Sequence, residues 1–209
     1  KKIHIIGGGD GTSYQVFGEK LQGVYWEKSP AMIWLAKRNL QSSRLEFRLG
    51  KFAPLESEEA EVVILPFVLD TLRVEEIRTL LGQIKNAMSP NGLLIVSDFF
   101  PAKAFGQRVL EKVMLWFFRW AAKHPRKDIP FLPLFLEKEE FRLVERRTWR
   151  KGWIFSAVYS LDGERPKWFS ILRSEGELPL FHRGVPWELS IISDENGDPN
   201  RSAKSIGQR

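Results

Sequence analysis

The chain has 209 residues, of which 43% are hydrophobic and 12% aromatic, enough to bury the core of one domain with a short appendage. It has no cysteine, which excludes disulfide bonds, thiolate metal sites and a cysteine nucleophile, and its three histidines are too scattered to predict a metal site. The formal net charge of +6 is spread over short clusters, and we interpret it as solvated surface charge.

No run of residues reaches the ~18 consecutive apolar positions that a membrane-spanning helix needs. The first residues lead directly into an apolar run of strand character, so no signal peptide is expected. Together with the lack of cysteine, these features predict a cytoplasmic protein.

The first two-thirds of the chain alternates short apolar runs with amphipathic segments, which is typical of a doubly wound α/β sheet. Ile3–Ile6 predicts a strand that ends in a glycine-rich turn, and a helix is expected over Thr12–Glu19. Gly23–Trp26 predicts a second strand ending at Glu27. Ser29-Pro30 then predicts the start of a helix that runs to Leu40, because serine caps free amides and proline suits the first turn.

The same alternation continues to about residue 100. Arg44–Arg48 and Glu61–Leu65 predict the third and fourth strands, and the second of these is nearly all apolar, as expected when both faces are covered. Val74–Ala87 has helical periodicity. Ser89–Gly92 predicts a turn before a fifth strand at Leu93–Val96, which ends at Ser97-Asp98.

The pattern changes after Pro101. Val109–Ala122 predicts a helix rich in tryptophan and phenylalanine, which either lines an apolar acceptor pocket or packs into the core or a dimer contact. Arg142–Thr148 and Trp153–Tyr159 predict an antiparallel hairpin. Trp187–Ile192 has strand character, and Asp194–Arg209 is a polar tail. We therefore expect one domain over residues 1–161 and an extension of unknown role over 162–209.

The expected fold is Rossmann-like: a doubly wound, mostly parallel seven-stranded sheet with a C-terminal antiparallel hairpin and helices on both faces. In such sheets, ligands bind beyond the carboxyl ends of the strands. The first strand is followed by Gly7-x-Gly9-x-Gly11, whose glycines let the backbone pass close to a ligand. The second strand ends at Glu27, a carboxylate that can accept hydrogen bonds from both hydroxyls of a ribose.

The glycine spacing differs from the G-x-G-x-x-G of dinucleotide-binding folds, because Thr12 or Tyr14 stands where the third glycine is needed. Gly7-x-Gly9-x-Gly11 instead resembles the first motif of class I S-adenosylmethionine-dependent methyltransferases. Three later segments, Val24–Met32, Ala60–Asp70 and Met88–Phe99, resemble further motifs of that family in order. The resemblance covers about residues 2–160 and is closest to methyltransferases of ubiquinone and menaquinone biosynthesis.

The resemblance implies S-adenosylmethionine as cofactor, a small-molecule methyl acceptor and no metal. It places the glycine turn beneath the methionine part of the cofactor and Glu27 at the ribose, with Met32, Lys51 and Phe52 near the adenine. Met32 could equally fill the core. It also places Leu65, Pro66 and Phe67 along the wall near the methyl group. The cofactor-binding residues expected on this basis are Gly7, Gly8, Gly9, Asp10, Gly11, Glu27, Lys28, Met32, Lys51, Phe52, Pro66 and Phe67.

The sequence departs from the family at two positions. Ile5 stands where an acidic residue normally anchors the cofactor's ammonium through the loop, and either Asp10 or backbone carbonyls would have to compensate. Lys51 stands near the place of an aspartate that contacts the adenine amino group, and lysine has no acceptor atom.

Methyl transfer needs no catalytic base when the acceptor is already nucleophilic, and the sequence singles out no base. The polar candidates are Asp70, Asp98, His124 and Tyr14. For Asp98 the alternative is a turn residue, and for His124 it is a helix-end residue.

Two other functions are weighed against methyl transfer. One is a binding module that has lost catalysis and uses its basic clusters on RNA or another polyanion. In a hairpin, however, alternate side chains face opposite sides, so Arg146, Arg147 and Arg150 would not form one face. The other is aminopropyl transfer of the spermidine-synthase type, which is less favoured because Asp70 stands alone after the fourth strand.

Overall fold

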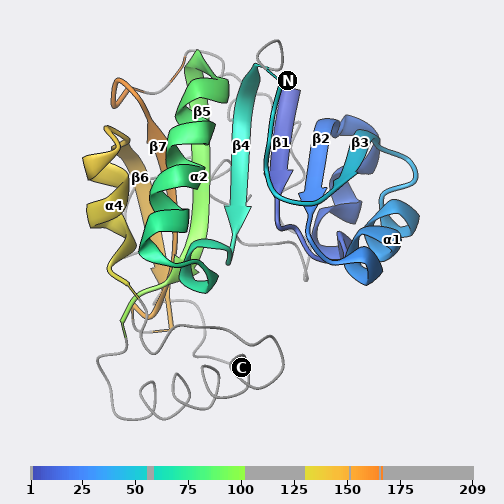
Figure 1. The fold of residues 1–209 in the computed structure, drawn as a ribbon, viewed down its shortest axis with the longest axis horizontal. Helices are drawn as coiled ribbons and strands as arrows, with labels where there is room; N and C mark the ends of the chain where they lie inside the picture. Colours follow the sequence, from blue (N-terminus) through green and yellow to red (C-terminus); the bar gives the residue numbers. More distant parts are fainter. Residues whose placement is uncertain (1, 56–58, 102–129, 151, 165, 167–209) are drawn as a thin grey trace, which may run out of the picture.

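The computed structural model describes residues 2–55, 59–101, 130–150, 152–164 and 166. Within them, seven strands form one sheet in the order β3-β2-β1-β4-β5-β7-β6 (Figure 1). Strands β1 to β5 pair in parallel, and both pairs made by β7 are antiparallel. The expected Rossmann-like fold with a C-terminal hairpin is confirmed.

The strands are β1 (Lys2–Ile6), β2 (Gln22–Glu27), β3 (Arg44–Leu49), β4 (Ala60–Pro66), β5 (Met88–Phe99), β6 (Arg142–Trp149) and β7 (Ile154–Ser160). The helices are the 3₁₀ helix η1 (Thr12–Lys20), α1 (Pro30–Asn39), the single 3₁₀ turn η2 (Leu69–Thr71), α2 (Val74–Ala87) and α4 (Leu132–Lys138).

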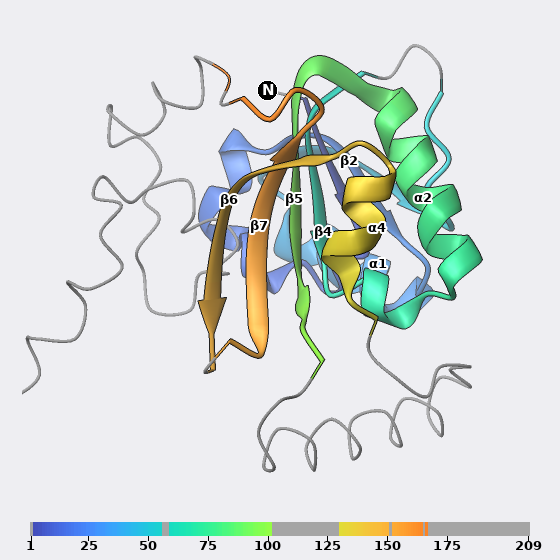
Figure 2. The ribbon, with the colours of Figure 1, turned by 90° about the vertical axis from the view of Figure 1, so that its left-hand side faces the viewer.

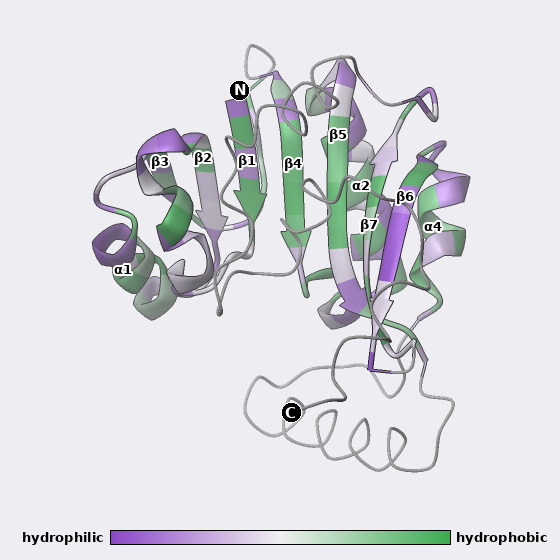
Figure 3. Ribbon diagram, turned by 180° about the vertical axis from the view of Figure 1, so that it is seen from behind, coloured by the Kyte–Doolittle hydropathy of each residue, from purple (hydrophilic) through white to green (hydrophobic). Residues whose placement is uncertain are grey.

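Two apolar cores lie on opposite faces of the sheet, because successive side chains of a strand point to opposite sides. On one face, α2 and α4 pack through residues such as Leu81 and Leu136 (Figure 2). On the other, η1 and α1 pack through residues such as Tyr14 and Ala36. Apolar residues are concentrated in the central strands, whereas the edge strand β6 is hydrophilic (Figure 3). The sheet is therefore buried at its centre and solvated at that edge.

Local sequence accounts for the helix that follows β2. Ser29 accepts a hydrogen bond from the Met32 amide through its hydroxyl at 3.3 Å, and Pro30 occupies the first helical position. Ile33 and Ala36, one turn apart, are buried against the sheet. The predicted helix start is confirmed.

Three elements differ from expectation. Residues 12–20 form a 3₁₀ helix whose turns close through i to i+3 bonds, such as Tyr14 to Gly11 at 2.9 Å, and no side chain caps its start. Strand β5 begins at Met88, and the predicted turn Ser89–Gly92 is a bulge, because Met88 pairs with Ala60 while Leu93 pairs with Val62. Helix α4 was not predicted at all.

The predicted helix Val109–Ala122, the strand Trp187–Ile192 and the tail Asp194–Arg209 lie outside the described residues. In the part of the chain that the structure describes, no helix is long and apolar enough to cross a membrane.

Candidate functional site

The order of the sheet reverses between β1 and β4, and the glycine turn lies at this point. Gly7, Gly9 and Gly11 have φ values of 71°, 66° and 74°, a region that side chains other than glycine's rarely adopt. A Cβ atom on Gly7 would lie 2.6 Å from a methyl of Val68, whereas one on Gly9 would meet no atom within 4 Å. The loop is thus packed against Val68, the residue before η2, at Gly7, and the space beside Gly9 is open.

The peptide group of Gly9 is held from both sides by residues of β2. Its amide donates to Oε2 of Glu27 at 3.1 Å, and its carbonyl accepts from the Tyr25 hydroxyl at 3.1 Å. Burial, followed by the nearby charges of Glu27 and Asp10, raises the pKa of Tyr25, so this hydroxyl stays protonated and remains a donor. The loop is therefore fixed to the end of β2 before any ligand arrives.

Glu27 keeps acceptor capacity for a ligand. Each of its carboxylate oxygens accepts one backbone amide, from Gly9 and from Ser29 at 2.9 Å. A carboxylate oxygen can accept two hydrogen bonds, so one position on each oxygen is left for a diol such as the two ribose hydroxyls. The sequence-based role of Glu27 at a ribose stays a prediction, and its geometry is suited to it.

A cleft of about 680 Å³ opens beside the glycine turn. The predicted residues that line it are Gly7, Glu27, Lys28, Lys51, Phe52 and Phe67. Sequence reasoning missed other lining residues, which include Trp26, Val68, Thr71, Thr79, Leu80 and Gln83. Three of these come from α2, and only the packing of that helix beside the cleft reveals them.

Other predicted residues lie elsewhere. Met32 is 41% exposed on α1 and is not among the cleft-lining residues, and the alternative that it fills the core is wrong. Leu65 is fully buried in the core and does not line the cleft. Pro66 closes β4 without lining the cleft.

The two departures from the family pattern have different structural outcomes. Ile5 is completely buried in the core, so no carboxylate reaches the loop from β1. Asp10 lies in the loop itself, and its carboxylate accepts from the amide and the hydroxyl of Thr12, at 3.1 and 2.8 Å. Lys51 lines the cleft beside Phe52, which packs edge-on against Trp26 at 5.4 Å.

Among the candidate bases, Asp98 is completely buried at the end of β5. Its Oδ2 atom accepts from the backbone amide of Asp70 at 3.2 Å, and Oδ1 accepts from its neighbour Phe99 at 2.9 Å. Burial, and then the charge of Asp70, raise the pKa of Asp98 well above the usual range of an aspartate. Asp98 is a strand residue rather than a turn residue, and it holds η2 in place.

Tyr14 is not suited to be a base in the cleft. Its side chain is 1% exposed within the core, edge-on to Tyr25 at a ring distance of 6.5 Å. His124 lies outside the described residues. Among the residues that the structure describes, no group of three histidine, aspartate or glutamate side chains could hold a metal ion.

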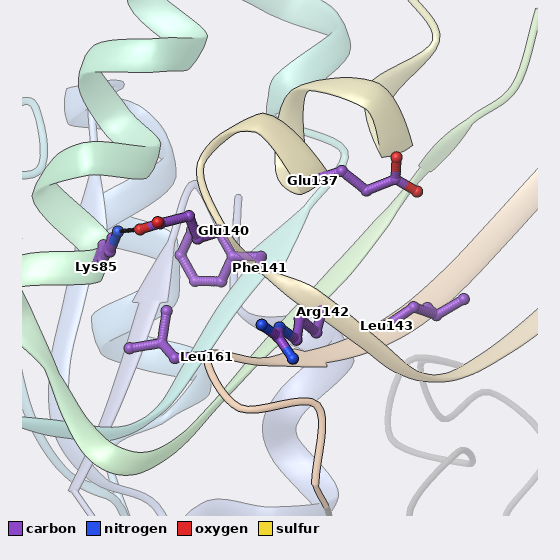
Figure 4. Close-up of a pocket in the computed structure, with 7 residues that line it drawn as sticks. All are labelled: Lys85, Glu137, Glu140, Phe141, Arg142, Leu143 and Leu161. Atoms are coloured by element: carbon purple, nitrogen blue, oxygen red, sulfur yellow. Dashed lines mark hydrogen bonds and ion pairs between the residues drawn. The ribbon is translucent and has the colours of Figure 1, made fainter.

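A second hollow, of about 590 Å³, lies at the opposite end of the sheet, between α2, α4 and the start of β6 (Figure 4). Its rim carries an ion pair between Lys85 and Glu140, with Phe141 and Leu161 beneath and Arg142 opposite. It contains no predicted site residue. Because ligands of such sheets bind at the carboxyl ends of the strands, the cleft beside the glycine turn is the candidate site.

Comparison with known proteins supports this choice. A family described as a methyltransferase domain matches residues 5–96, which include the glycine turn, Glu27 and Phe67. A methyltransferase domain is thus matched over residues 5–96, a little under half of the chain, and S-adenosylmethionine is the cofactor that this match supports. None of the curated protein sequences matches the chain.

Solved structures share the fold of the methyltransferase domain at low identity. Mitomycin 7-O-methyltransferase is 20% identical, with a TM-score of 0.59 over 76% of this chain and 48% of its own. An O-methyltransferase family 2 protein from Planctomyces limnophilus, solved with apigenin, is 13% identical, with a TM-score of 0.59 over 76% of this chain and 49% of its own. A protein described as a pericyclic reaction enzyme is 18% identical, with a TM-score of 0.59 over 77% and 42%.

The chain spans about half the length of these solved relatives. One of them is described by a different reaction, so the shared fold does not decide the chemistry.

Proposed function

We propose that the chain transfers a methyl group from S-adenosylmethionine to a small acceptor that is apolar or aromatic in character. The observation that supports this most is that one cleft is lined both by the start of the glycine turn, at Gly7, and by Glu27, whose carboxylate oxygens keep acceptor positions for a ribose. The match of residues 5–96 to a methyltransferase domain supports the same cofactor.

S-adenosylmethionine has three parts, the ribose, the methionine part and the base. The residues at the cleft are best suited to the first two. Glu27 is suited to the ribose, and the absence of a side chain at Gly9 leaves room for the methionine part. Because Ile5 supplies no carboxylate, the cofactor's ammonium depends on Asp10 or on backbone carbonyl groups of the loop. The ring of Phe52 offers an apolar surface for the base, and Lys51 offers only donors.

When bound, S-adenosylmethionine would supply a sulfonium methyl group for attack by a nucleophile, with S-adenosylhomocysteine as the leaving group. The protein's task is then to orient the acceptor and to exclude water. Phe67 and Val68 form the wall of the cleft nearest the glycine turn and serve this task. No step requires a base when the acceptor is already ionised or otherwise nucleophilic.

The alternative of an RNA-binding module is less favoured by the arrangement of the basic residues on β6. Arg147 lies 3.7 Å from the Glu145 carboxylate, whereas Arg146 lies over the Phe100 ring at 5.7 Å. Adjacent residues of a strand face opposite sides, so these two charges do not add up to one surface for a phosphate backbone.

The proposal is tested by transfer of a labelled methyl group from S-adenosylmethionine to a panel of small phenols, catechols and quinols. We expect label in at least one extracted product with the wild-type protein and its loss in Gly9→Ala, whose methyl group enters the open space of the loop. The matched control is Gly152→Ala in the β6–β7 turn, where φ is also positive (79°) and a Cβ also meets no atom within 4 Å.

Both variants should lose about 1 kcal/mol of stability from the strained backbone. Only Gly9→Ala should lose transfer. Equal transfer by the two variants would contradict the assignment of the cleft as the cofactor site.

A further inference from the structure

Three aromatic rings form a continuous wall that begins in the cleft. Phe67 lines the cleft and lies 5.1 Å from the Phe99 ring, which in turn lies 5.1 Å from the ring of Trp153; both pairs are tilted by 46°. We call these three residues the aromatic wall. Phe67 follows β4, Phe99 ends β5 and Trp153 precedes β7, and the pairing of Phe99 with Ile154 brings them to one end of the sheet.

The aromatic wall is not part of the two cores that hold the fold together. None of its three residues belongs to either apolar cluster, and Phe67 and Phe99 are only half-buried, whereas Trp153 is 7% exposed and lies behind the Phe99 ring. The neighbouring aromatic group formed by Phe100 and Phe155 differs, because Phe155 is fully buried in the core. Phe67 and Phe99 thus form the half-buried part of the wall next to the cleft, and the buried Trp153 supports it from behind.

The backbone at Phe67 supports a functional reading. Its φ is +52°, a conformation that is costly for a bulky residue, and its amide is held by a 2.7 Å bond to the carbonyl of Ser97. Strained residues of this kind are found most often at ligand sites. The strain places the Phe67 ring between the cleft and Phe99.

We propose that the aromatic wall is the acceptor-binding surface and that the acceptor is a planar aromatic compound. Tilted ring pairs with centroids about 5 Å apart can accept a further flat ring in an offset or edge-on contact, which a saturated ring of equal size cannot make. The identity of the wall as an acceptor site rests on the proposed methyl transfer. Its preference for flat rings can be measured independently of catalysis.

The test uses 2-naphthol and its saturated counterpart decahydro-2-naphthol, titrated into the full chain with and without S-adenosylhomocysteine. We expect 2-naphthol to bind at least about threefold more tightly than the saturated alcohol. Phe99→Leu should weaken 2-naphthol about threefold to tenfold and leave the affinity for S-adenosylhomocysteine unchanged. The control Phe131→Leu changes a ring that is 55% exposed and lies outside the wall, and it should change neither affinity.

Circular dichroism establishes whether Phe99→Leu is folded, and Phe67→Leu replaces it if it is not. Equal binding of the two alcohols, or unchanged 2-naphthol binding in the folded wall variant, would overturn the proposal. If S-adenosylhomocysteine fails to bind while 2-naphthol still distinguishes Phe99→Leu from Phe131→Leu, then methyl transfer is wrong and the preference of the wall for flat rings stands.

Discussion

At the scale of single residues, the buried carboxyl of Asp98 has the largest consequence. It is completely buried, it lies beside Asp70, and its two oxygens accept the backbone amides of Asp70 and Phe99. Desolvation disfavours the charged form, and the pKa of Asp98 is accordingly raised. Because the unfolded chain releases this proton at lower pH than the folded protein, the folded state loses stability as the pH rises from about 4 through the raised pKa.

We therefore expect the stability difference between wild type and Asp98→Asn to depend on pH. The wild type should lose free energy of unfolding relative to the variant as the pH rises from about 4 through the raised pKa of Asp98, with a slope of at most about 1.4 kcal/mol per pH unit. Urea denaturation of both proteins at several pH values measures this. The Asp98→Asn variant also loses one of the two hydrogen bonds from backbone amides. This loss changes the difference in free energy of unfolding by about 1 kcal/mol at every pH and leaves its slope against pH unchanged.

Asp162→Asn is the matched control for this measurement. Asp162 is exposed, and hydrogen bonds from the Glu164 amide and the Ser160 hydroxyl lower its pKa. Because this pKa lies below that of an unfolded aspartate, the wild type should gain stability relative to Asp162→Asn with rising pH only below about pH 4, and the difference should be flat above that pH. A flat difference for Asp98→Asn would mean that Asp98 is ionised in the folded protein across this range.

At the scale of elements, the end of α4 explains why that helix was missed. The amides of Glu140 and Phe141 return to the carbonyls of Glu137 and Leu136, both at 3.0 Å, which is the bonding pattern of a Schellman motif. Glycine normally occupies the left-handed position of this motif, and its presence marks a helix end in a sequence. Here Glu140 occupies it with φ +67°, so the usual signal is absent.

The comparison of Glu140→Gly with Glu140→Ala tests this account. Both substitutions remove the exposed ion pair to Lys85, so its loss cancels in the comparison, but only glycine removes the backbone strain (Figure 4). Glu140→Gly should be more stable than Glu140→Ala by about 1 kcal/mol in thermal or urea unfolding. Alanine as stable as glycine would mean that the helix end carries no strain.

The elements that could be predicted are those whose signal is local. Nearly unbroken apolar runs indicate β1, β4 and β5, and Ser29-Pro30 indicates the start of α1. The bulge before Leu93 depends on the pairing of β5 with β4. The 3₁₀ geometry of η1 depends on how this helix packs between the sheet and α1. Neither feature can be predicted from a local sequence pattern.

At the scale of the whole molecule, the candidate site is assembled from segments far apart in the chain. The loop after β1 is fixed by β2 through Tyr25 and Glu27, and it packs against Val68, the residue before η2. Residues at the carboxyl ends of the strands could be predicted from the sequence to lie at the site, because the carboxyl ends of all parallel strands lie at the same edge of the sheet. It could not place Thr79 or Gln83 of α2, whose approach to the cleft depends on tertiary packing.

The measurement that tests the account most directly is a calorimetric titration of the full chain with S-adenosylhomocysteine, repeated with Glu27→Ala. Glu27 both shapes the loop and keeps acceptors for a ribose, so we predict roughly micromolar binding to the wild type and at least a tenfold loss in a folded Glu27→Ala protein. Absence of binding to the folded wild type, or equal binding by both proteins, would contradict the assignment of this cleft as the cofactor site.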